Sequence, residues 1–346
     1  MTTAGPCNAP DVVDVVALGE SMVTFLPTRP GRLADVPSFD RAIGGAESNV
    51  ACVLAAAGHR ARWVSRVGAD GFGDHLVETI GGYGVDVTSV RRDPARPTGI
   101  YFRTAGDRSA DDHEVAYYRA GSAASAMAPQ NVDLAALRAA RVLHLTGITA
   151  ALSTQCLDLV RALTAPVAGR PLVSFDVNHR PGLWRGDAGA RVLLELAGRA
   201  DIVFVGEDEA AQLWGPAGPD AVREALPGPG VLVVKQGGAG ATVYAGDTAA
   251  FVPALRVDVV AAVGAGDAFA AGFLSATLRG LPVRDRLRHG HLMAAAALTV
   301  PGDLAAPPSR DHADRLAALD EESWGRLRLG PGWTQADQAP EEVGTP

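Results

Sequence analysis

Short runs dominated by β-branched residues alternate with segments of helical periodicity along most of this chain. The runs occupy residues 12–20, 62–68, 141–147, 171–177, 201–207 and 230–236. Apolar runs of this length are typical of parallel strands that are buried on both faces. The helical segments between them, such as 46–58 and 73–84, end at glycine. The alternation predicts an α/β fold, doubly wound, with a mostly parallel central sheet flanked by helices.

Two segments break this alternation. Residues 26–45 hold too many prolines and glycines for a helix, and residues 98–121 hold two β-rich runs around a polar loop. We expect a small inserted β-sheet lid, built from about 22–44 and 97–120, outside the main sheet. A disordered leader is expected over 1–10 and a disordered tail over 320–346, because periodicity is lost there. A single domain over 11–319 remains.

The overall charge narrows the class of partner. The chain has 346 residues, of which 47% are hydrophobic, and its formal net charge is −8. A nucleic-acid-binding protein usually carries an excess of basic residues, and this chain has an excess of acidic ones. The three cysteines lack metal-binding spacing, and no apolar run reaches membrane-spanning length. The N-terminal pattern predicts no signal peptide, because its apolar run carries an acid and no basic segment precedes it. We therefore expect a cytoplasmic protein that binds neither nucleic acid nor membrane.

Several well-known phosphate-binding signatures are absent from the sequence. The P-loop pattern G-x-x-x-x-G-K-[ST] does not occur, since the only lysine, Lys235, follows valines. Neither glycine cluster completes G-x-G-x-x-G, and His179-Arg180-Pro181 is not a protein-kinase catalytic loop. The sequence therefore favours neither a P-loop enzyme nor a nicotinamide dehydrogenase.

The most informative string is Gly264-Ala265-Gly266-Asp267, where a helix is predicted to begin. Three peptide N–H groups can point at an anion there, and the helix dipole adds positive potential. Asp267 beside such an anion could take a proton from a hydroxyl that attacks a phosphate. The alternative is an ordinary glycine-rich helix start, because an acid in the first turn favours the dipole in any case.

Two further strings suit a polar ligand. The Gly44-Gly45 pair would let a ligand approach the backbone, and Asn49 could hydrogen-bond a polyol. Arg180 follows a buried strand and could hold a carboxylate through two parallel hydrogen bonds, with Arg119 beside the expected lid. The simpler alternatives are a tight turn, and a salt bridge from Arg180 to Asp176 or to a surface acid.

A third string combines glycines with acids. Gly237, Gly238 and Gly240 follow a predicted strand and could accept a nucleotide. Glu207 and Glu209 open a helix, where acids are favoured regardless of function, and could alternatively serve magnesium.

Together these strings resemble the ribokinase-like, or pfkB, family of sugar kinases over about residues 12–316. GGAESN (44–49) is similar to the family's N-terminal glycine signature and VGAGDAFAAGFL (263–274) to its C-terminal signature. KQGGAG (235–240) is similar to the loop on the nucleotide side, and GEDEA (206–210) to the N-x-x-E motif. Within the family the chain most resembles 2-keto-3-deoxygluconate kinases, in the strings YYRAGSAAS (117–125), HLTGITAAL (144–152), FDVNHRPGLW (175–184) and PGDLAAP (301–307).

The resemblance implies an ATP-dependent kinase that phosphorylates 2-keto-3-deoxy-D-gluconate at O6, with Mg²⁺, in a homo-oligomer of two or more chains. It makes Asp267 the base and the amides of Gly264, Ala265 and Gly266 the anion hole. The residues it implies for the sugar acid are Gly44, Gly45, Asn49, Tyr101, Tyr117, Tyr118, Arg119, Arg180 and Asp303. Those it implies for ATP are Lys235, Gly237, Gly240, Gly264, Gly266 and His291, with Glu209 linked to magnesium through water.

Three positions depart from the family pattern. The Asp-Thr pair linked to monovalent-cation activation is Ala261-Ala262 here, so we expect no potassium dependence. The asparagine of N-x-x-E is Gly206, and His291 replaces an asparagine near the adenine, where it could stack instead. Two other functions stay open: a fructokinase or ribokinase, and an inactive sugar-acid-binding sensor. Arg119 and Arg180 argue against a neutral sugar, and the retained base and glycines argue against a sensor.

Overall fold

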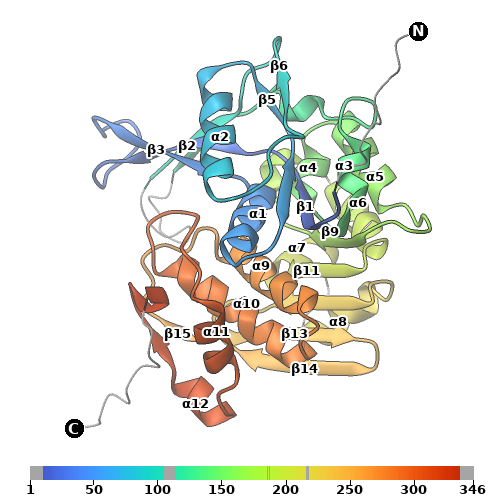
Figure 1. Cartoon of the computed structure of the whole chain (residues 1–346), viewed down its shortest axis with the longest axis vertical. Coiled ribbons are helices and arrows are strands. Elements are labelled where there is room, and N and C mark those ends of the chain that lie inside the picture. The colour runs from blue at the N-terminus through green and yellow to red at the C-terminus, as the bar shows by residue number, and fades with distance from the viewer. Residues whose placement is uncertain (1–10, 105–113, 185, 187, 216–217, 336–346) are drawn as a thin grey trace.

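An eight-stranded sheet forms the centre of the computed structural model, which describes residues 11–335 apart from 105–113, 185, 187 and 216–217 (Figure 1). In sheet order the strands are β14 (Thr248–Pro253), β13 (Gly240–Ala245), β12 (Val231–Lys235), β11 (Ile202–Gly206), β10 (Leu172–Asp176), β9 (Ala140–Thr146), β1 (Val13–Leu18) and β4 (Ala61–Val64). Every pair from β12 to β4 is parallel, whereas β13 and β14 pair antiparallel at one edge. The predicted doubly wound, mostly parallel sheet is confirmed.

Helices cover both faces of this sheet. One face packs against α1 (Ala46–Ala56), α2 (Gly71–Gly82), α9 (Ala265–Leu278), α10 (Val283–Leu298), α11 (Arg310–Ala317) and α12 (Glu321–Arg326). The other packs against α3 (Leu134–Arg138), α4 (Gly147–Ala151), α5 (Thr154–Thr164), α6 (Ala188–Gly198), α7 (Glu207–Trp214) and α8 (Pro219–Ala225). Along β1, Val15 and Ala17 enter the first core while Val16 and Leu18 enter the second. Successive strand residues point to opposite faces, so a strand buried on both faces must be apolar throughout.

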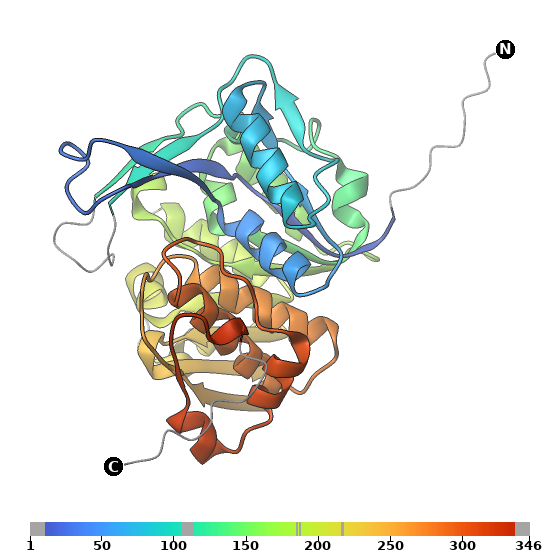
Figure 2. The ribbon, with the colours of Figure 1, turned by 60° about the vertical axis from the view of Figure 1, so that its left-hand side comes forward.

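A small four-stranded sheet stands apart from the main one, in the order β3 (Phe39–Gly44), β2 (Met22–Pro27), β7 (Ile100–Arg103) and β8 (Val115–Tyr118). Figure 2 shows it extending from one side of the molecule. The ring of Phe102 stacks on Phe25 at 4.7 Å and meets Phe39 edge-on at 5.1 Å, which gives the sheet an aromatic layer of its own. The expected inserted sheet is confirmed, and the polar loop between β7 and β8 lies outside the described residues.

Shorter elements complete the described chain. A two-stranded parallel pair joins β5 (Arg66–Gly68) to β6 (Arg91–Asp93). The 3-10 helices are η1 (Ala124–Ala126), η2 (Pro181–Leu183), η3 (Gly237–Ala239) and η4 (Trp333–Gln335). Within the described residues, every helix lacks either the length or the apolar composition that crossing a bilayer requires.

The expectation of a disordered tail from residue 320 is wrong up to residue 335. This segment forms α12, a parallel pair of β16 (Arg328–Leu329) with β15 (Arg256–Val257), and η4. Trp324 is only 1% exposed, donates its Nε1–H to the carbonyl oxygen of Pro253 at 3.0 Å and lies 4.7 Å from the Arg288 guanidinium. The buried apolar residues of this segment are too widely spaced to show a helical or strand period. The hydrophobic pattern therefore did not predict that the segment packs against the core. Residues 1–10 and 336–346 lie outside the described residues.

Candidate active site

A cavity of about 1570 Å³ opens between the carboxyl ends of the central strands, the start of α9 and the small sheet. Carboxyl ends of parallel strands are where ligands bind in such sheets. Single small-molecule sites measure roughly 300–1,000 Å³, so this cavity has room for two ligands side by side. We call the part around Lys235, Glu209 and Gly237 the nucleotide half and the part around Asn49, Tyr101 and Arg119 the sugar half, after the roles predicted for these residues. Asp267 lines the same cavity.

The glycine loop forms the start of α9 as the sequence predicted. Gly264 caps the helix with a φ of +77°, a left-handed conformation that favours glycine. A Cβ placed on Gly264 would lie 2.2 Å from the carbonyl oxygen of Asp303, so a larger residue would also clash. The first N–H groups of a helix have no intrahelical partner, and two residues at the start of α9, Gly264 and Gly266, line the cavity. The loop is therefore built to receive an anion.

Asp267 lies in the first turn of α9, and its Oδ2 accepts a hydrogen bond from Nδ2 of Asn49 at 2.9 Å. Burial raises the pKa of Asp267 to about 7, against the lowering effect of the Asn49 bond, and the neighbouring Asp176 carboxylate raises it further. A carboxyl that titrates near neutral pH is well matched to general-base catalysis. Asn49 in α1 and Asp267 in α9 thus form one hydrogen-bonded pair from two distant parts of the sequence.

The nucleotide half is lined by groups at the ends of three neighbouring strands. Lys235 ends β12, and its Nζ donates to Oδ2 of Asp176 at 2.9 Å and to Oδ1 at 3.2 Å. Asp176 ends β10 and is 2% exposed. Glu209, in the first turn of α7, accepts hydrogen bonds from the backbone N–H groups of Gly206, at 3.0 Å, and His179. Burial and the Asp176 charge raise the pKa of Glu209.

The small sheet supplies lining residues to the sugar half. Tyr101 from β7 and Tyr117 from β8 both line the cavity, with their ring centres 5.4 Å apart. Asp303 lines the same wall and is held by Arg103 of β7, whose Nη2 lies 3.2 Å from Oδ1. A Cβ on Gly44 would lie 2.2 Å from the Tyr101 hydroxyl, which explains the glycine there.

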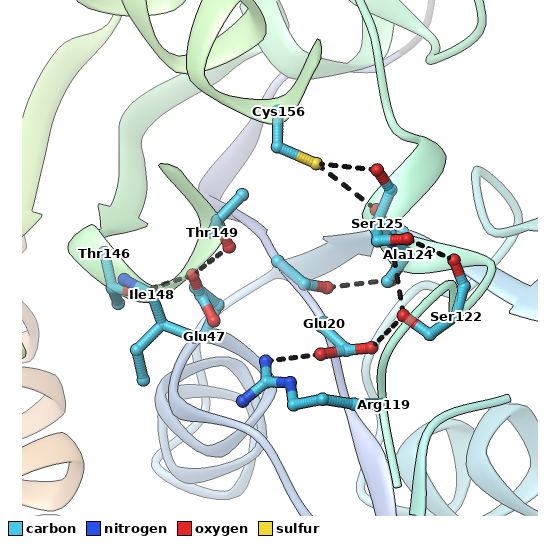
Figure 3. A network of polar contacts seen from close by, with 12 residues as sticks. Glu20, Glu47, Arg119, Ser122, Ala124, Ser125, Thr146, Ile148, Thr149 and Cys156 are labelled. Carbon is cyan, nitrogen blue, oxygen red and sulfur yellow. Dashed lines mark hydrogen bonds and ion pairs between the residues drawn. The ribbon is translucent and has the colours of Figure 1, made fainter. Parts of the chain in front are cut away.

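A buried polar network includes Arg119, a residue of the sugar half (Figure 3). Arg119 lines the cavity and forms an ion pair with Glu20, whose other oxygen accepts a hydrogen bond from the Ser122 hydroxyl at 2.5 Å. Glu20 is 3% exposed, so this arginine is positioned by a carboxylate that ligands do not reach directly.

Glu47 forms the second part of this network. It is fully buried, and one of its oxygens accepts hydrogen bonds from the hydroxyls of Thr146 at 2.7 Å and Thr149 at 2.6 Å. Burial raises the pKa of Glu47, although the two hydroxyls and the Arg119 charge oppose this. The carboxyl also packs against Gly19, where an added Cβ would lie 2.1 Å from its Cδ. Glu47 therefore links α1, β9 and α4 beneath the cavity.

Most of the predicted site residues come together in this one cavity. Those that line it are Gly45, Asn49, Tyr101, Tyr117, Arg119, Arg180, Glu209, Lys235, Gly237, Gly264, Gly266, Asp267 and Asp303. Arg180 donates to the carbonyl oxygen of His179 at 3.3 Å, and no ion pair found among the described residues includes it. The salt bridge considered between Arg180 and Asp176 is not formed, because Asp176 is paired with Lys235.

Three predicted contacts are corrected by the structure. His291 in α10 is 7% exposed; its Nε2 lies 3.1 Å from the Val252 carbonyl oxygen and its ring packs in the core, so it does not stack on an adenine. Tyr118 is 64% exposed on the face of β8 opposite to Tyr117, as strand alternation requires. Gly240 lies within the main sheet at a φ of +144°, where an added Cβ would be 2.3 Å from the Val252 carbonyl oxygen. A glycine is therefore needed at this position for strand packing and not for nucleotide binding.

Asp176 and Asp208 line the cavity but were not predicted from the sequence. Nor were Glu20, Glu47 and Arg103, which do not line it: Glu20 pairs with Arg119, Arg103 pairs with Asp303, and Glu47 lies in the buried network. Asp176 carries a readable signal, because a carboxylate that ends a buried strand must lie at the ligand edge of the sheet. Glu20 follows β1 at the same edge. Arg103 and Glu47 carry no such signal, since their partners are 200 and about 100 positions away in the chain.

Comparisons with known proteins agree with this arrangement. The profile of the pfkB family carbohydrate kinases matches residues 13–310. Over 306 residues the chain is 36% identical to a 2-dehydro-3-deoxygluconokinase of Bacillus subtilis, covering 86% of this chain and 94% of that protein. It is equally 36% identical, over 309 residues, to a 2-dehydro-3-deoxygluconokinase of Thermoproteus tenax, covering 88% and 94% of the two chains. An uncharacterized sugar kinase from Pyrococcus horikoshii, solved in complex with ATP, superposes with a TM-score of 0.76 at 26% identity, covering 86% of this chain and 96% of that one.

Proposed function

The chain belongs to the pfkB family of carbohydrate kinases, and we propose that it transfers the γ-phosphoryl group of ATP to O6 of 2-keto-3-deoxygluconate. The sugar-kinase activity follows from the family. The choice of a sugar acid is supported by one observation above all: the guanidinium groups of Arg119 and Arg180 line the same cavity as Asp267. Arginine suits planar, bidentate capture of a carboxylate.

In the proposed reaction Asp267 acts as the general base. Its carboxylate takes the proton of the O6 hydroxyl while O6 attacks the γ-phosphorus. The bond between that phosphorus and the β–γ bridging oxygen breaks, and ADP leaves with the electron pair. The N–H groups at the start of α9, from Gly264 to Gly266, hydrogen-bond the oxygens of the phosphoryl group as it passes. Asn49 keeps the Asp267 carboxylate in place through the 2.9 Å bond. Its own Oδ1 is buried without a partner among the described residues, so it can accept a hydrogen bond from a sugar hydroxyl.

Magnesium enters this proposal with the nucleotide. Among the described residues, no group of three or more His, Cys, Asp or Glu side chains could hold a metal ion. Backbone N–H groups hold the carboxylate of Glu209 in place, and the remaining lone pairs of its oxygens would contact the ion through water in this proposal. The ion would neutralise phosphate charge as the bond to the leaving group breaks. Gly237 and Gly238 line the nucleotide half, where their backbone could lie against ATP.

The test is an ADP-release assay with the purified protein and ATP·Mg²⁺. The acceptors are 2-keto-3-deoxygluconate, 2-keto-3-deoxygalactonate, fructose and ribose, and phosphorus NMR locates the phosphoryl group on the product. We expect kcat/KM to be highest for a keto-deoxy sugar acid, with O6 phosphorylated. A preference for fructose or ribose would overturn the proposed substrate but not the kinase. Calorimetric binding of the acid without any ADP release would instead indicate a sugar-acid sensor.

Replacing Arg180 separates a sugar acid from a neutral sugar as the natural substrate. Arg180→Ala should raise KM for the acid about 10- to 100-fold, the range expected for hydrogen bonds to a charged group. KM for a neutral sugar should change by less than about 3-fold, because it has no carboxylate to lose. Arg60→Ala is the matched control, since that side chain is 63% exposed. Equal effects on both sugars would contradict the carboxylate role.

We also propose a cytoplasmic enzyme that assembles as a dimer or larger homo-oligomer. The family's sugar-phosphorylating chemistry and the reduced state of Cys52 and Cys156, both buried and unpaired, support the location. Size-exclusion chromatography with light scattering tests the assembly, and a monomer at micromolar concentration would contradict it.

A further inference from the structure

We propose that Lys235 is a catalytic residue whose ammonium binds the phosphoryl group in transfer, and that Asp176 is the positioning residue that holds it there. The proposal rests on the sugar-kinase activity but not on which sugar is phosphorylated. It goes beyond a general contact with ATP, because it assigns Lys235 to the reacting γ-phosphoryl group and gives a role to Asp176.

The position of the ammonium carries this proposal. Lys235 and Asp176 end β12 and β10, with β11 between them, so both lie at the edge of the sheet that faces the cavity. The Nζ of Lys235 lies only 3.7 Å from where a Cβ on Gly266 would be. Lys235 and Gly266 line the same cavity. A positive charge therefore lies directly beside the amides that would receive the transferring phosphoryl group.

The hydrogen bonds of Lys235 leave it able to bind a ligand. An ammonium has three N–H donors, and the bonds to Oδ1 and Oδ2 of Asp176 occupy at most two of them. Its side chain is 22% exposed, although that of Asp176 is only 3% exposed. A phosphoryl oxygen can thus bind the remaining donor without breaking the pair with Asp176.

Neighbouring carboxylates stabilise the protonated, positively charged form of Lys235. Burial alone would lower its pKa, but the carboxylates of Asp176 and Glu209 outweigh burial and the pKa is raised. The hydrogen bonds found for the ammonium go to Asp176, whereas the oxygens of Glu209 accept from backbone N–H groups. Asp176 therefore fixes the position of Lys235, while Glu209 contributes charge from its place at the start of α7.

A charge beside the anion hole acts mainly on the transition state. The ammonium meets the phosphoryl oxygens where negative charge is spread as the bond to ADP breaks, and a preorganised positive charge there lowers the barrier. Removing it should lower kcat far more than it weakens the binding of the sugar. A lysine that only stabilised the fold would not separate kcat from KM in this way.

The kinetic test compares Lys235→Met with Lys235→Arg. Methionine keeps most of the side-chain volume without the charge, and we expect kcat to fall at least about 100-fold, within the range for loss of one electrostatic contact to the transition state. KM for the sugar should stay within about 3-fold, and arginine should restore part of kcat. Arg60→Met is the control, since its side chain is 63% exposed. A Lys235→Met variant with kcat within about 3-fold of the unmodified protein would overturn the proposal.

The unmodified protein offers a second test that does not depend on activity or on a variant that folds. Lys235 is the only lysine in the chain, so reductive methylation reports on this ammonium, with the terminal amine as an internal reference. We expect the β,γ-methylene analogue of ATP with Mg²⁺ to slow methylation of Lys235 much more than ADP does. Equal protection by the two nucleotides would show that Lys235 does not contact the γ-phosphoryl group. This result holds even if the proposed sugar acid proves not to be the substrate.

Asp176→Asn tests the positioning role. Asparagine removes the charge that holds Lys235 and also the charge that raises the pKa of Asp267. We expect kcat to fall about 10-fold and the acidic limb of the kcat/KM profile to move to lower pH by about 0.5 to 1 pH unit, as removal of a nearby like charge requires. If the acidic limb stayed at the same pH, the positioning role would be contradicted. A purely structural loss would lower the rate without shifting the acidic limb of the kcat/KM profile.

Discussion

Replacing Asp267 by asparagine should abolish most of the activity and at the same time make the protein more stable. The variant removes the proton acceptor, so we expect kcat to fall about 100- to 10,000-fold. Asparagine is nearly the same size, and its Oδ1 can still accept the hydrogen bond that Asn49 donates to Asp267 at 2.9 Å. What it eliminates is a carboxylate charge that the folded protein disfavours.

The size of the gain follows from the pKa of Asp267. Folding raises that pKa from 3.8 to about 7, chiefly through burial. A raised pKa means that the folded state binds the proton more tightly, so stability is highest below the unfolded pKa and is lost as the pH rises through 7. At about 1.4 kcal/mol for each pH unit, the full difference is about 4 kcal/mol above pH 7. Because the carboxyl faces an open cavity, where solvent screens charges, we expect about half of this, or ~2 kcal/mol at pH 8.

Urea unfolding of the unmodified protein and of Asp267→Asn, at pH 5 and pH 8, measures this directly. The variant should gain about 2 kcal/mol at pH 8 and less than about 1 kcal/mol at pH 5, where Asp267 is largely protonated in the folded state. Asp11→Asn is the control, since its side chain is 87% exposed and its replacement should change stability by less than about 0.5 kcal/mol. The kcat/KM of the unmodified enzyme should rise with pH through about 7. If the variant gained no more stability over the unmodified protein at pH 8 than at pH 5, the reasoning would be refuted, because the folded protein would then not disfavour the charge.

Three further outcomes are expected. Trp324→Ala should lower the free energy of unfolding by about 3 to 5 kcal/mol, since that ring is 1% exposed, and calorimetry would show it; a change below about 1 kcal/mol would contradict the packed C-terminal segment. Gly264→Ala should reduce kcat at least about 10-fold, because the φ of +77° and the carbonyl of Asp303 leave no room for a Cβ; wild-type rates would show that the loop relaxes without cost. Potassium chloride should stimulate turnover by less than about 2-fold over sodium chloride, because 261–262 are alanines without side-chain oxygens; strong stimulation would show that other groups bind the cation.

Local patterns were enough to predict the central sheet and the glycine loop. Each strand of the sheet carries its own apolar run, and the helix predicted to begin at the glycine loop is α9, with Gly264 at its N-cap. The cavity could be predicted for a related reason: residues that follow parallel strands meet at one edge of the sheet. This rule brought Arg180 and Lys235 together although 55 positions separate them in the printed sequence.

Contacts between distant elements were not predictable in the same way. His291 lies in a helix whose surroundings are set by Phe269 and Trp324, so the core position of its ring depends on the C-terminal segment that was expected to be disordered. Tyr118 was taken with Tyr117 as part of one string, and strand alternation separates them. Such errors arise because a family resemblance assigns a role to every residue of a matching string. The backbone geometry lets only some of those side chains reach the cavity.

Arg119, Arg180 and Lys235 are the Lys and Arg side chains that line the cavity among the described residues, and they differ in how much of their charge a ligand can use. The chain carries a net charge of −8, yet it must bind ATP and, in our proposal, a sugar acid. Lys235 is paired with Asp176 and Arg119 with Glu20, so each presents a positive charge partly balanced by a buried carboxylate. These pairs fix the positions of the cations but weaken their attraction for a second anion. Arg180 has no such pairing among the described residues, and it therefore has the most charge to offer. The discrimination between a sugar acid and a neutral sugar should accordingly depend more on Arg180 than on Arg119.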